Sequence, residues 1–552
     1  MISAFSGAKR LLLESGKGEH KMKLPEMLAF WFAMQFIVAG FTEAQVLTHG
    51  PVVGAVTASE AKVFVRTDSA ANVALRYGTD SNLQTYAVSN SMTTSEAADF
   101  TATILLAGLG PEATYYLDVV VNGVPQFLAP PFPSFTTFPA SGSARNFQFV
   151  VLTDFDTVST LKRGVQTFAS AAANLPAFVF IGGDFDHSNP KTLADKRQMF
   201  KSLYDVKTRF MGDFVSLILR RFPIAHQWDD HDAGLNNLDK TYPDWNLSQQ
   251  AFQEYTPTYP LPAVSPGIWQ KFSYAQAEFF VLDCRSQRDY WLDPEGPDKS
   301  MLDGNNLGAI GQLQWLENGL LTSTARWKII FTSVITNPTT KQNEGWAAYS
   351  TEWNALKSFI NNNHISGIIF IAGDLHLGAV DNGTQAGFPE MSVTQANETD
   401  TGFCASAATG IWSEGYYDDT CAGYGLVSVA QNPDRVTLQV MDEDGVAHIT
   451  YVVVDGTPTP TPTPPPEPPA ITKQPANKRV KVGQTAIFSV TASGTPPLSY
   501  QWRKNQIDLP GATRPSYTTP PAGAGDNGAV FAVTVTNSFG AVTSRNARLK
   551  VQ

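Results

Sequence analysis

The stretch FVFIGGDFDH (178–187) decides the fold, because a short apolar run ends abruptly in glycines, carboxylates and an imidazole. Runs this short and this rich in Val, Ile and Phe are typical of strands buried on both faces of a sheet. Five other segments repeat the pattern of an apolar run that stops at polar or charged residues: FVVLTDFDT (149–157), HQWDDHDAGLNN (226–237), FFVLDCRSQR (279–288), IIFTSVITN (329–337) and IIFIAGDLH (368–376). Ligands of open α/β sheets bind outside the carboxyl ends of the strands, so we expect these polar residues to meet there.

The acids and imidazoles at the strand ends predict a metal site. The candidate groups are Asp154, Asp156, Asp184, His187, Asp230, His231, Asp374 and His376. So many such groups could share a pocket only if cations offset their repulsion. Two metals about 3.5–4 Å apart can activate a water and hold a phosphoryl group, and they need one shared carboxylate. Asp184 is our candidate for that bridge, because the preceding Gly182 and Gly183 permit a tight turn.

These segments resemble the metallophosphoesterase superfamily, and specifically its PhoD-type alkaline phosphatase and phosphodiesterase branch. Gly183-Asp184 matches the start of the GDxxD block of the superfamily. Residues 228–237, WDDHD…NN, resemble the PhoD-type version of the following block, GNHD. Residues 282–288 resemble the "LDxRxxR" segment of the branch, and residues 373–376 its "GDxH". The similarity covers roughly residues 146–454.

The resemblance implies a metal-dependent phosphatase or phosphodiesterase with two divalent or mixed-valence ions, of Ca, Mn, Fe or Zn. It implies metal ligation by Asp154, Asp184, Asp230, Asp374 and His376. A metal-bound hydroxide would attack phosphorus in line, while His231 contacts the phosphoryl group or the leaving oxygen and Arg285 forms a fork onto phosphate oxygens. Asp156 replaces the histidine of the superfamily DxH block. At the positions where the branch usually has a Cys and a Tyr, this chain has Asp154 and His187. We add Asp156 and His187 to the predicted metal ligands. Asn237, Asp229 and Arg288 are expected to support this set.

Other interpretations of the same residues remain open. An Asp at a strand end is often a helix cap or turn former, which could hold for Asp186, Asp229, Asp232 and Asp283. Arg285 could simply neutralise a buried acid. The rival functions are a surface adhesion or binding protein with a degenerate phosphoesterase core, and a metal-dependent hydrolase of another bond, such as a lactone.

The flanking segments predict two β-sandwich domains around an α/β core of two mixed sheets flanked by helices. Residues 46–138 alternate polar and apolar positions and resemble a fibronectin type III domain, which predicts an antiparallel β-sandwich. The catalytic core is expected over 139–456, and a stiff Pro/Thr linker over 457–469. Residues 470–552 resemble a bacterial immunoglobulin-like domain, expected as a spacer or as a contact to a cell surface or polymer.

Composition bounds the partners and the compartment. The 552 residues carry a formal charge of −11 with no basic run, which argues against nucleic-acid binding. The apolar stretch 28–41 follows Lys23 and precedes small residues, which predicts a signal peptide over 1–44 with Met22 as the biological start. We therefore expect a protein that is secreted, held at the cell surface or periplasmic, without a membrane span after processing. Cys404 and Cys421 could form a disulfide, and Cys284 is expected to be a buried small residue.

Overall fold

The structure is a computed structural model that describes residues 45–155, 165–207, 209–263, 266–303, 311–396, 410–417, 422–454, 468–494, 498–537 and 539–552. The predicted signal peptide, Asp156, Cys404, Cys421 and the linker up to residue 467 lie outside these ranges. Within the described ranges, no helix is both long enough and apolar enough to span a bilayer.

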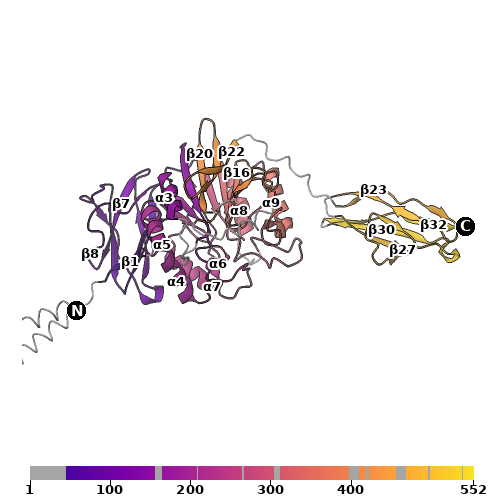
Figure 1. Ribbon diagram of the computed structural model, residues 1–552, viewed down its shortest axis with the longest axis horizontal. Coiled ribbons are helices and arrows are strands. Elements are labelled where there is room, and N and C mark those ends of the chain that lie inside the picture. The colour runs from indigo at the N-terminus through magenta and orange to yellow at the C-terminus, as the bar shows by residue number, and fades with distance from the viewer. Residues whose placement is uncertain are drawn as a thin grey trace, which may run out of the picture.

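Two mixed sheets form the centre of the molecule (Figure 1). In the described residues, nine strands form the first sheet, in the order β22 (Ala447–Val454), β21 (Arg435–Asp442), β20 (Gly423–Ala430), β10 (Phe147–Leu152), β11 (Val179–Ile181), β12 (Ile224–His226), β1 (Leu47–Gly54), β2 (Glu60–Thr67) and β6 (Thr101–Ala107). The second sheet has seven described strands, in the order β13 (Gln270–Tyr274), β14 (Ala277–Val281), β15 (Trp327–Thr332), β16 (Ile368–Ala372), β18 (Pro389–Ser392), β17 (Gly378–Asn382) and β19 (Tyr416–Tyr417). Neighbours β10, β11 and β12 are parallel, as are β14, β15, β16 and β18.

The alternation of side chains along each central strand produces four layers. Phe149 and Val151 of β10 pack in the core between the two sheets, while Val150 and Leu152 pack against helices. Phe180 of β11 stacks on Phe331 of β15 across the sheets with ring centroids 3.5 Å apart. Both faces of these strands are therefore apolar, which explains their continuous hydrophobic runs.

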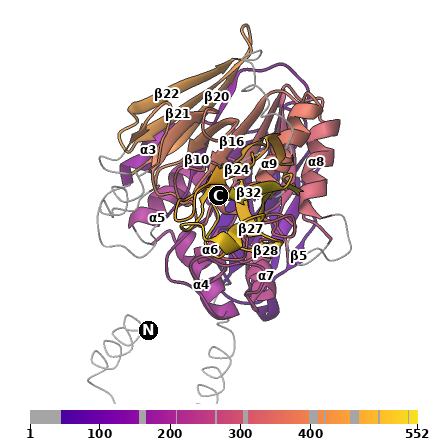
Figure 2. The same ribbon diagram turned by 90° about the vertical axis from the view of Figure 1, so that its right-hand side faces the viewer.

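Helices cover both outer faces, as Figures 1 and 2 show. The first sheet packs against α3 (Val165–Ala173), α4 (Leu193–Leu203), α5 (Arg209–Phe214), the π-helical turn Val215–Leu219 and α7 (Trp245–Tyr255). The second sheet packs against α8 (Gln312–Thr322), the 3₁₀ turn Trp346–Tyr349 and α9 (Ser350–Asn362). This arrangement confirms the predicted core of two mixed sheets flanked by helices.

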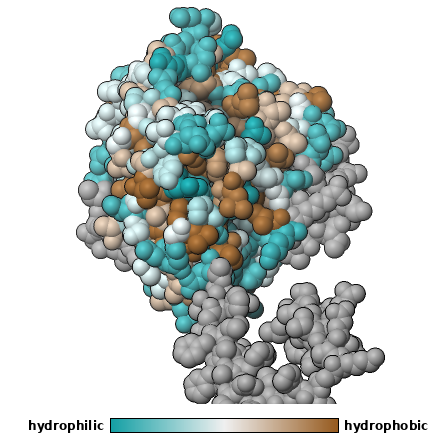
Figure 3. Space-filling model, turned by 90° about the vertical axis from the view of Figure 1, so that its left-hand side faces the viewer, coloured by the Kyte–Doolittle hydropathy of each residue, from teal (hydrophilic) through white to brown (hydrophobic). Residues whose placement is uncertain are grey.

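The N-terminal region is a two-layer β structure that shares a sheet with the core. Its second sheet has the order β4 (Ala87–Val88), β3 (Asn72–Gly78), β7 (Thr114–Val121) and β8 (Val124–Pro125), with β5 (Met92–Thr93) on β3 and β9 (Ser134–Thr136) on β7; a 3₁₀ turn covers Glu96–Ala98. Its other layer, β1, β2 and β6, continues into the first core sheet through the parallel pairing of Gly54 with Ile224. Figure 3 views this side, where apolar patches lie among polar ones, and exposed apolar side chains of the region include Val88, Val124 and Leu128.

The C-terminal domain is a separate β-sandwich, yellow in Figure 1. One sheet has the order β24 (Lys478–Val480), β32 (Ala547–Val551), β30 (Val530–Asn537), β27 (Ser499–Lys504) and β28 (Ile507–Asp508), with β31 (Gly540–Thr543) on β30. The remaining strands pair as β23 (Ala470–Lys473) with β26 (Thr491–Ser493) and β25 (Ile487–Ser489) with β29 (Ser516–Thr518), and a 3₁₀ turn covers Ala524–Asp526. Trp502 is fully buried and donates to Arg514 O at 2.9 Å, while Val490 and Val533 are both buried. Val490 and Val533 stand where immunoglobulin domains commonly carry a disulfide, so apolar packing takes the place of that bond.

Two buried carboxylates face each other on neighbouring strands of the second sheet. Asp381 of β17 is directly paired with Glu390 of β18, and both are fully buried. Within the described chain, Asp381 Oδ1 and Glu390 Oε2 accept no hydrogen bond. Burial is the main cause that raises the pKa of Glu390 to about 7, and the nearby Asp381 raises it further.

Replacing Glu390 with glutamine is expected to stabilise the protein at neutral and alkaline pH. The folded protein holds this proton more tightly than the unfolded chain, so the wild type loses stability as pH rises from about 4.5 to about 7. A glutamine stays neutral, and its amide can donate to Asp381 Oδ1. Urea unfolding at pH 8 should show a gain of up to about 3 kcal/mol. At pH 4.5 the gain should be small, and equal gains at both pH values would contradict this assignment.

Candidate metal centre

Asp184 lies at the end of β11, in a turn that only glycine permits. Gly183 has φ +100°, and a Cβ added there would lie 2.5 Å from Asp229 N. Asp184 itself adopts φ +52° and is 2% exposed. Its backbone N donates to Asp232 Oδ2 at 2.8 Å, and its backbone O accepts from Phe155 N at 2.6 Å. These contacts fix the direction of the Asp184 carboxylate.

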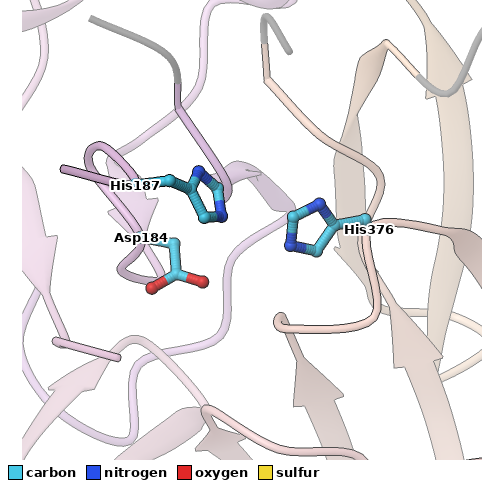
Figure 4. Close-up of side chains that lie close together, drawn as sticks. All are labelled: Asp184, His187 and His376. Atoms are coloured by element: carbon cyan, nitrogen blue, oxygen red, sulfur yellow. The ribbon is translucent and has the colours of Figure 1, made fainter. Parts of the chain in front are cut away.

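Three clusters of potential ligands share Asp184. The ligand atoms within each cluster lie within 4.8 Å of one another, and the clusters are Asp184/His187/His376, Asp184/Asp230/His231 and Asp184/Asp229/Asp230/Asp374. Figure 4 shows His187 and His376 approaching from opposite sides toward the space next to the Asp184 carboxylate. Asp154, at the end of β10, is fully buried and has Oδ1 3.2 Å from His376 Nε2. All the predicted ligands that the structure describes therefore come together, and Asp156 lies outside the described residues.

A short hydrogen-bond chain orients His231. Asn189 Nδ2 donates to His187 O at 3.2 Å, which turns Asn189 Oδ1 toward His231 Nδ1 at 2.8 Å. His231 Nδ1 therefore carries a proton that it donates to Asn189, and the lone pair of Nε2 is left for the cluster. Burial lowers the pKa of His231 to about 4 despite the opposing charge of Asp230, so the ring is neutral at neutral pH.

Arg285 is fully buried next to the carboxylates of the metal centre. It follows β14 and donates from Nε to Asp229 Oδ1 and from Nη2 to Asp374 Oδ1 at 2.8 Å. Nη2 also lies 3.4 Å from Asp230 Oδ1, and Nη1 lies 3.5 Å from Glu344 Oε1. Arg285 thus neutralises buried acids through Nε and Nη2, whereas its Nη1 makes no hydrogen bond among the described residues.

Lys341 supplies a second cation from the loop after β15. Its Nζ lies 2.9 Å from Asp374 Oδ2 and 2.5 Å from Asp374 O. Although burial alone would raise the pKa of Asp374, Lys341 and Arg285 hold it well below its usual range. Asp374 is therefore ionised at any pH at which the protein would work.

The other buried carboxylates of the centre repel one another. Burial, followed by the charges of Asp229 and Asp230, raises the pKa of Asp184 well above its usual range. Among the residues that the structure describes, seven carboxylates and three cationic side chains surround the centre. The carboxylates are Asp154, Asp184, Asp229, Asp230, Asp232, Asp374 and Glu344, and the cations are Arg285, Arg288 and Lys341. Such an excess of buried negative charge requires protons or bound cations.

Several polar residues near the centre have structural roles. Asp232 accepts backbone hydrogen bonds from Asp184, Phe185 and Asp229 at 2.7–2.8 Å, which caps the short helix α6 (Asp230–Ala233). Asp283 accepts from Trp228 Nε1 at 3.0 Å and from the backbone of the following turn. Arg288 donates to the carbonyls of Leu238 and Glu344. For Asp232 and Asp283, the simpler sequence interpretation of cap or turn former holds.

The other predicted supporting residues also lie at the centre. Asn237 N donates to Asp230 Oδ2, and its side-chain amide faces Glu344. Asp229 holds Arg285, as described above. Cys284 is buried with its Sγ 3.3 Å from Thr332 Oγ1, and burial raises its thiol pKa to about 12, which excludes a thiolate nucleophile at neutral pH.

Sequence reasoning missed Lys341, Glu344, Asn189 and Gln395. Gln395 pairs with Thr153 beside β10 and has Nε2 2.8 Å from His376 Nδ1. Asn189 stands two residues after His187, so its contact was accessible from local spacing. Lys341 and Glu344 follow IIFTSVITN (329–337), whose position at a strand end was the available signal.

The fold and the site define an α/β protein with two sheets between helices and a cluster of acids and imidazoles at the strand ends that could hold metal ions. Residues 184–451 match the family described as PhoD-like phosphatase. Residues 44–140 match a domain of unknown function, and residues 469–551 match the immunoglobulin I-set domain. The resemblances to PhoD-type proteins and to immunoglobulin-like domains are thereby confirmed.

One curated protein and two solved structures are similar to parts of this chain. Alkaline phosphatase D of Bacillus subtilis (strain 168) is 27% identical over 189 residues, which cover 29% of this chain and 32% of that protein. The match thus spans about a third of the length of this relative. A solved structure of PhoD covers 75% of this chain and 91% of its own, with a TM-score of 0.58 and 18% identity, and shows a shared fold. A purple acid phosphatase from yellow lupin aligns over 74% of both chains with a TM-score of 0.49 and 13% identity.

Proposed function

We propose that this protein is an exported, metal-dependent phosphatase or phosphodiesterase. The observation that carries the proposal is the sharing of Asp184 by three carboxylate and imidazole clusters inside a PhoD-like phosphatase domain. Export rests on the signal-peptide pattern of residues 1–44 and stays a prediction. N-terminal sequencing of secreted protein tests it.

The donor set fits two metal ions with Asp184 between them. His187, His376 and Asp154 would hold one ion, and Asp230, His231 and Asp374 would hold the other. The mixture of carboxylates with imidazoles suits Mn, Fe or Zn, and the carboxylate-rich side also suits Ca. When bound, such ions polarise a phosphoryl oxygen and lower the pKa of water.

The protein's own side chains would position this centre. Arg285 and Lys341 offset part of the carboxylate charge and fix the directions of Asp229 and Asp374. Asn189 sets the tautomer of His231, which presents a neutral Nε2 lone pair. That state suits a ligand or a base better than an acid, so we assign His231 to metal binding rather than to protonation of the leaving oxygen.

Removing the His231 ring should lower metal content and turnover together. His231→Ala deletes the proposed ligand, while Asn189→Ala removes only its orienting partner and should weaken metal affinity by about 10–100-fold. Asn318→Ala, at an exposed position on α8, is the matched control. Metal analysis and kcat on purified variants give the answer. Normal metal content in His231→Ala with a large loss of kcat would instead mean that His231 acts on the leaving oxygen.

The reaction class is tested with three small substrates. We expect turnover of p-nitrophenyl phosphate, of its bis-ester or of both, and none of an aryl lactone. Hydrolysis of the lactone alone would identify the rival hydrolase. Protein that is folded and metal-loaded but inactive on all three would favour the rival binding protein with a degenerate core.

A further inference from the structure

The C-terminal domain is strongly basic within an acidic chain. Residues 468–552 contain ten Lys and Arg but only two Asp and Glu, a formal charge of +8. The whole chain has 39 Lys and Arg against 50 Asp and Glu, so residues 1–467 carry 29 against 48, a formal charge of −19. In this domain, both acids form ion pairs, Arg503 with Asp508 and Lys504 with Asp526. The other eight cations have no acid of their own domain left to pair with.

Four of the ten cations lie on one face of the sheet β24–β32–β30–β27, and one of the four, Arg503, is the partner of Asp508. Arg479 is directly paired with Lys550 across β24 and β32, and Arg548 lies two residues before Lys550 on the same face. On the next strand, β30, Val530 is paired with Arg548 of β32, and Ala532, two residues further on, is paired with Arg503 of β27. Arg503 therefore lies on the same face of the sheet. Arg479, Arg548 and Lys550 are exposed, whereas the alternate residues Ala547, Leu549 and Val551 are buried. We call Arg479, Arg503, Arg548 and Lys550 the cationic face.

The cationic face extends across four neighbouring strands. Between its cations lie the short side chains of Val530, Ala532 and Thr534 on β30. Three strand spacings separate β24 from β27, or about 14 Å. A surface of this shape can contact several anionic groups of one extended chain at once. A single small anion on exposed cations would be bound weakly, because solvent and salt screen each contact.

We infer that the cationic face binds a linear polymer whose repeating unit carries a phosphate group. Three of its four cations are arginines, whose guanidinium forks match phosphate oxygens in pairs. The choice of phosphate over carboxylate rests on the proposed function, since a phosphoesterase domain is joined to this face in one chain. Residues 1–467 carry a net negative charge, which disfavours the binding of a polyanion to the rest of the surface.

The test uses the full-length protein and long-chain inorganic polyphosphate. Binding should be measurable at low salt and should weaken steeply as salt rises. The triple variant Arg479→Gln/Arg548→Gln/Lys550→Gln should bind about tenfold more weakly or worse. The matched control Lys473→Gln/Arg514→Gln/Arg545→Gln removes the same charge from exposed positions off the face, and should change affinity by less than about threefold.

Three outcomes would overturn the inference. Wild-type protein that does not bind polyphosphate at low salt has no such site. Equal weakening in both triple variants means diffuse attraction rather than a defined face. Equal affinity for polyglutamate of matched length rejects phosphate as the recognised group.

Catalysis is measured in parallel on a small phosphate ester, where the triple variant should match the wild type. Turnover without polymer binding would overturn this inference alone, and polymer binding without turnover would overturn the proposed function alone.

Discussion

Asp184→Asn is expected to reduce turnover to the background rate and to lower the bound metal. Asp184 is the residue that the three ligand clusters share, so its loss affects both proposed ions. An amide keeps the shape of the side chain but cannot supply negative charge to two cations. The free energy of unfolding of the metal-free protein should stay equal or rise, because the substitution relieves carboxylate repulsion at a buried position.

Asp195→Asn is the matched control, because Asp195 is exposed and caps α4. Metal analysis, kcat and urea unfolding are measured on both variants. Wild-type turnover in Asp184→Asn would remove the model of two ions bridged by Asp184. If Asp184→Asn lost turnover but kept its full metal content, Asp184 would contact the substrate rather than the metal ions.

Arg285→Met is expected to destabilise the metal-free protein by about 3–5 kcal/mol. The guanidinium is fully buried and contacts Asp229, Asp230 and Asp374, which the variant leaves without their main counter-charge. Bound metal supplies part of the missing positive charge, so the loss should be smaller in metal-loaded protein. Urea unfolding with and without metal measures both values, and Arg285→Lys should lie between the variant and the wild type.

The same variant separates the two interpretations of Arg285. A fork open to substrate phosphate would leave stability unchanged and raise KM for phosphate esters. Unchanged stability with a raised KM would therefore contradict the neutralising role.

The strand-end pattern explains why the fold and much of the centre could be predicted from sequence. Neighbouring residues such as Val150 and Val151 point to opposite sides of the sheet, and both sides are apolar. The strands therefore appear in the sequence as continuous apolar runs that end at polar residues. Parallel strands bring their carboxyl ends to one edge, and Asp184, Asp230 and Asp374 met there as expected. Glycines mark the turn before Asp184, which made that residue the natural candidate for the bridge.

Other features depend on contacts that sequence spacing does not reveal. Arg285 matches a phosphate-binding motif, and only its burial against three acids favours a different role. The tautomer of His231 depends on the side-chain orientation of Asn189. The cations of the C-terminal domain alternate with core residues along β32, so they form no basic run, and the negative charge of the whole chain conceals them.

The most direct test of the central claim is a metal titration of turnover. Full-length protein is stripped with a chelator, reloaded stepwise with Mn, Zn, Fe or Ca, and assayed on p-nitrophenyl phosphate and its bis-ester while bound metal is counted. We expect no turnover in stripped protein, and recovery that reaches its plateau at about two ions per chain. Full turnover in protein shown to be free of metal would contradict it.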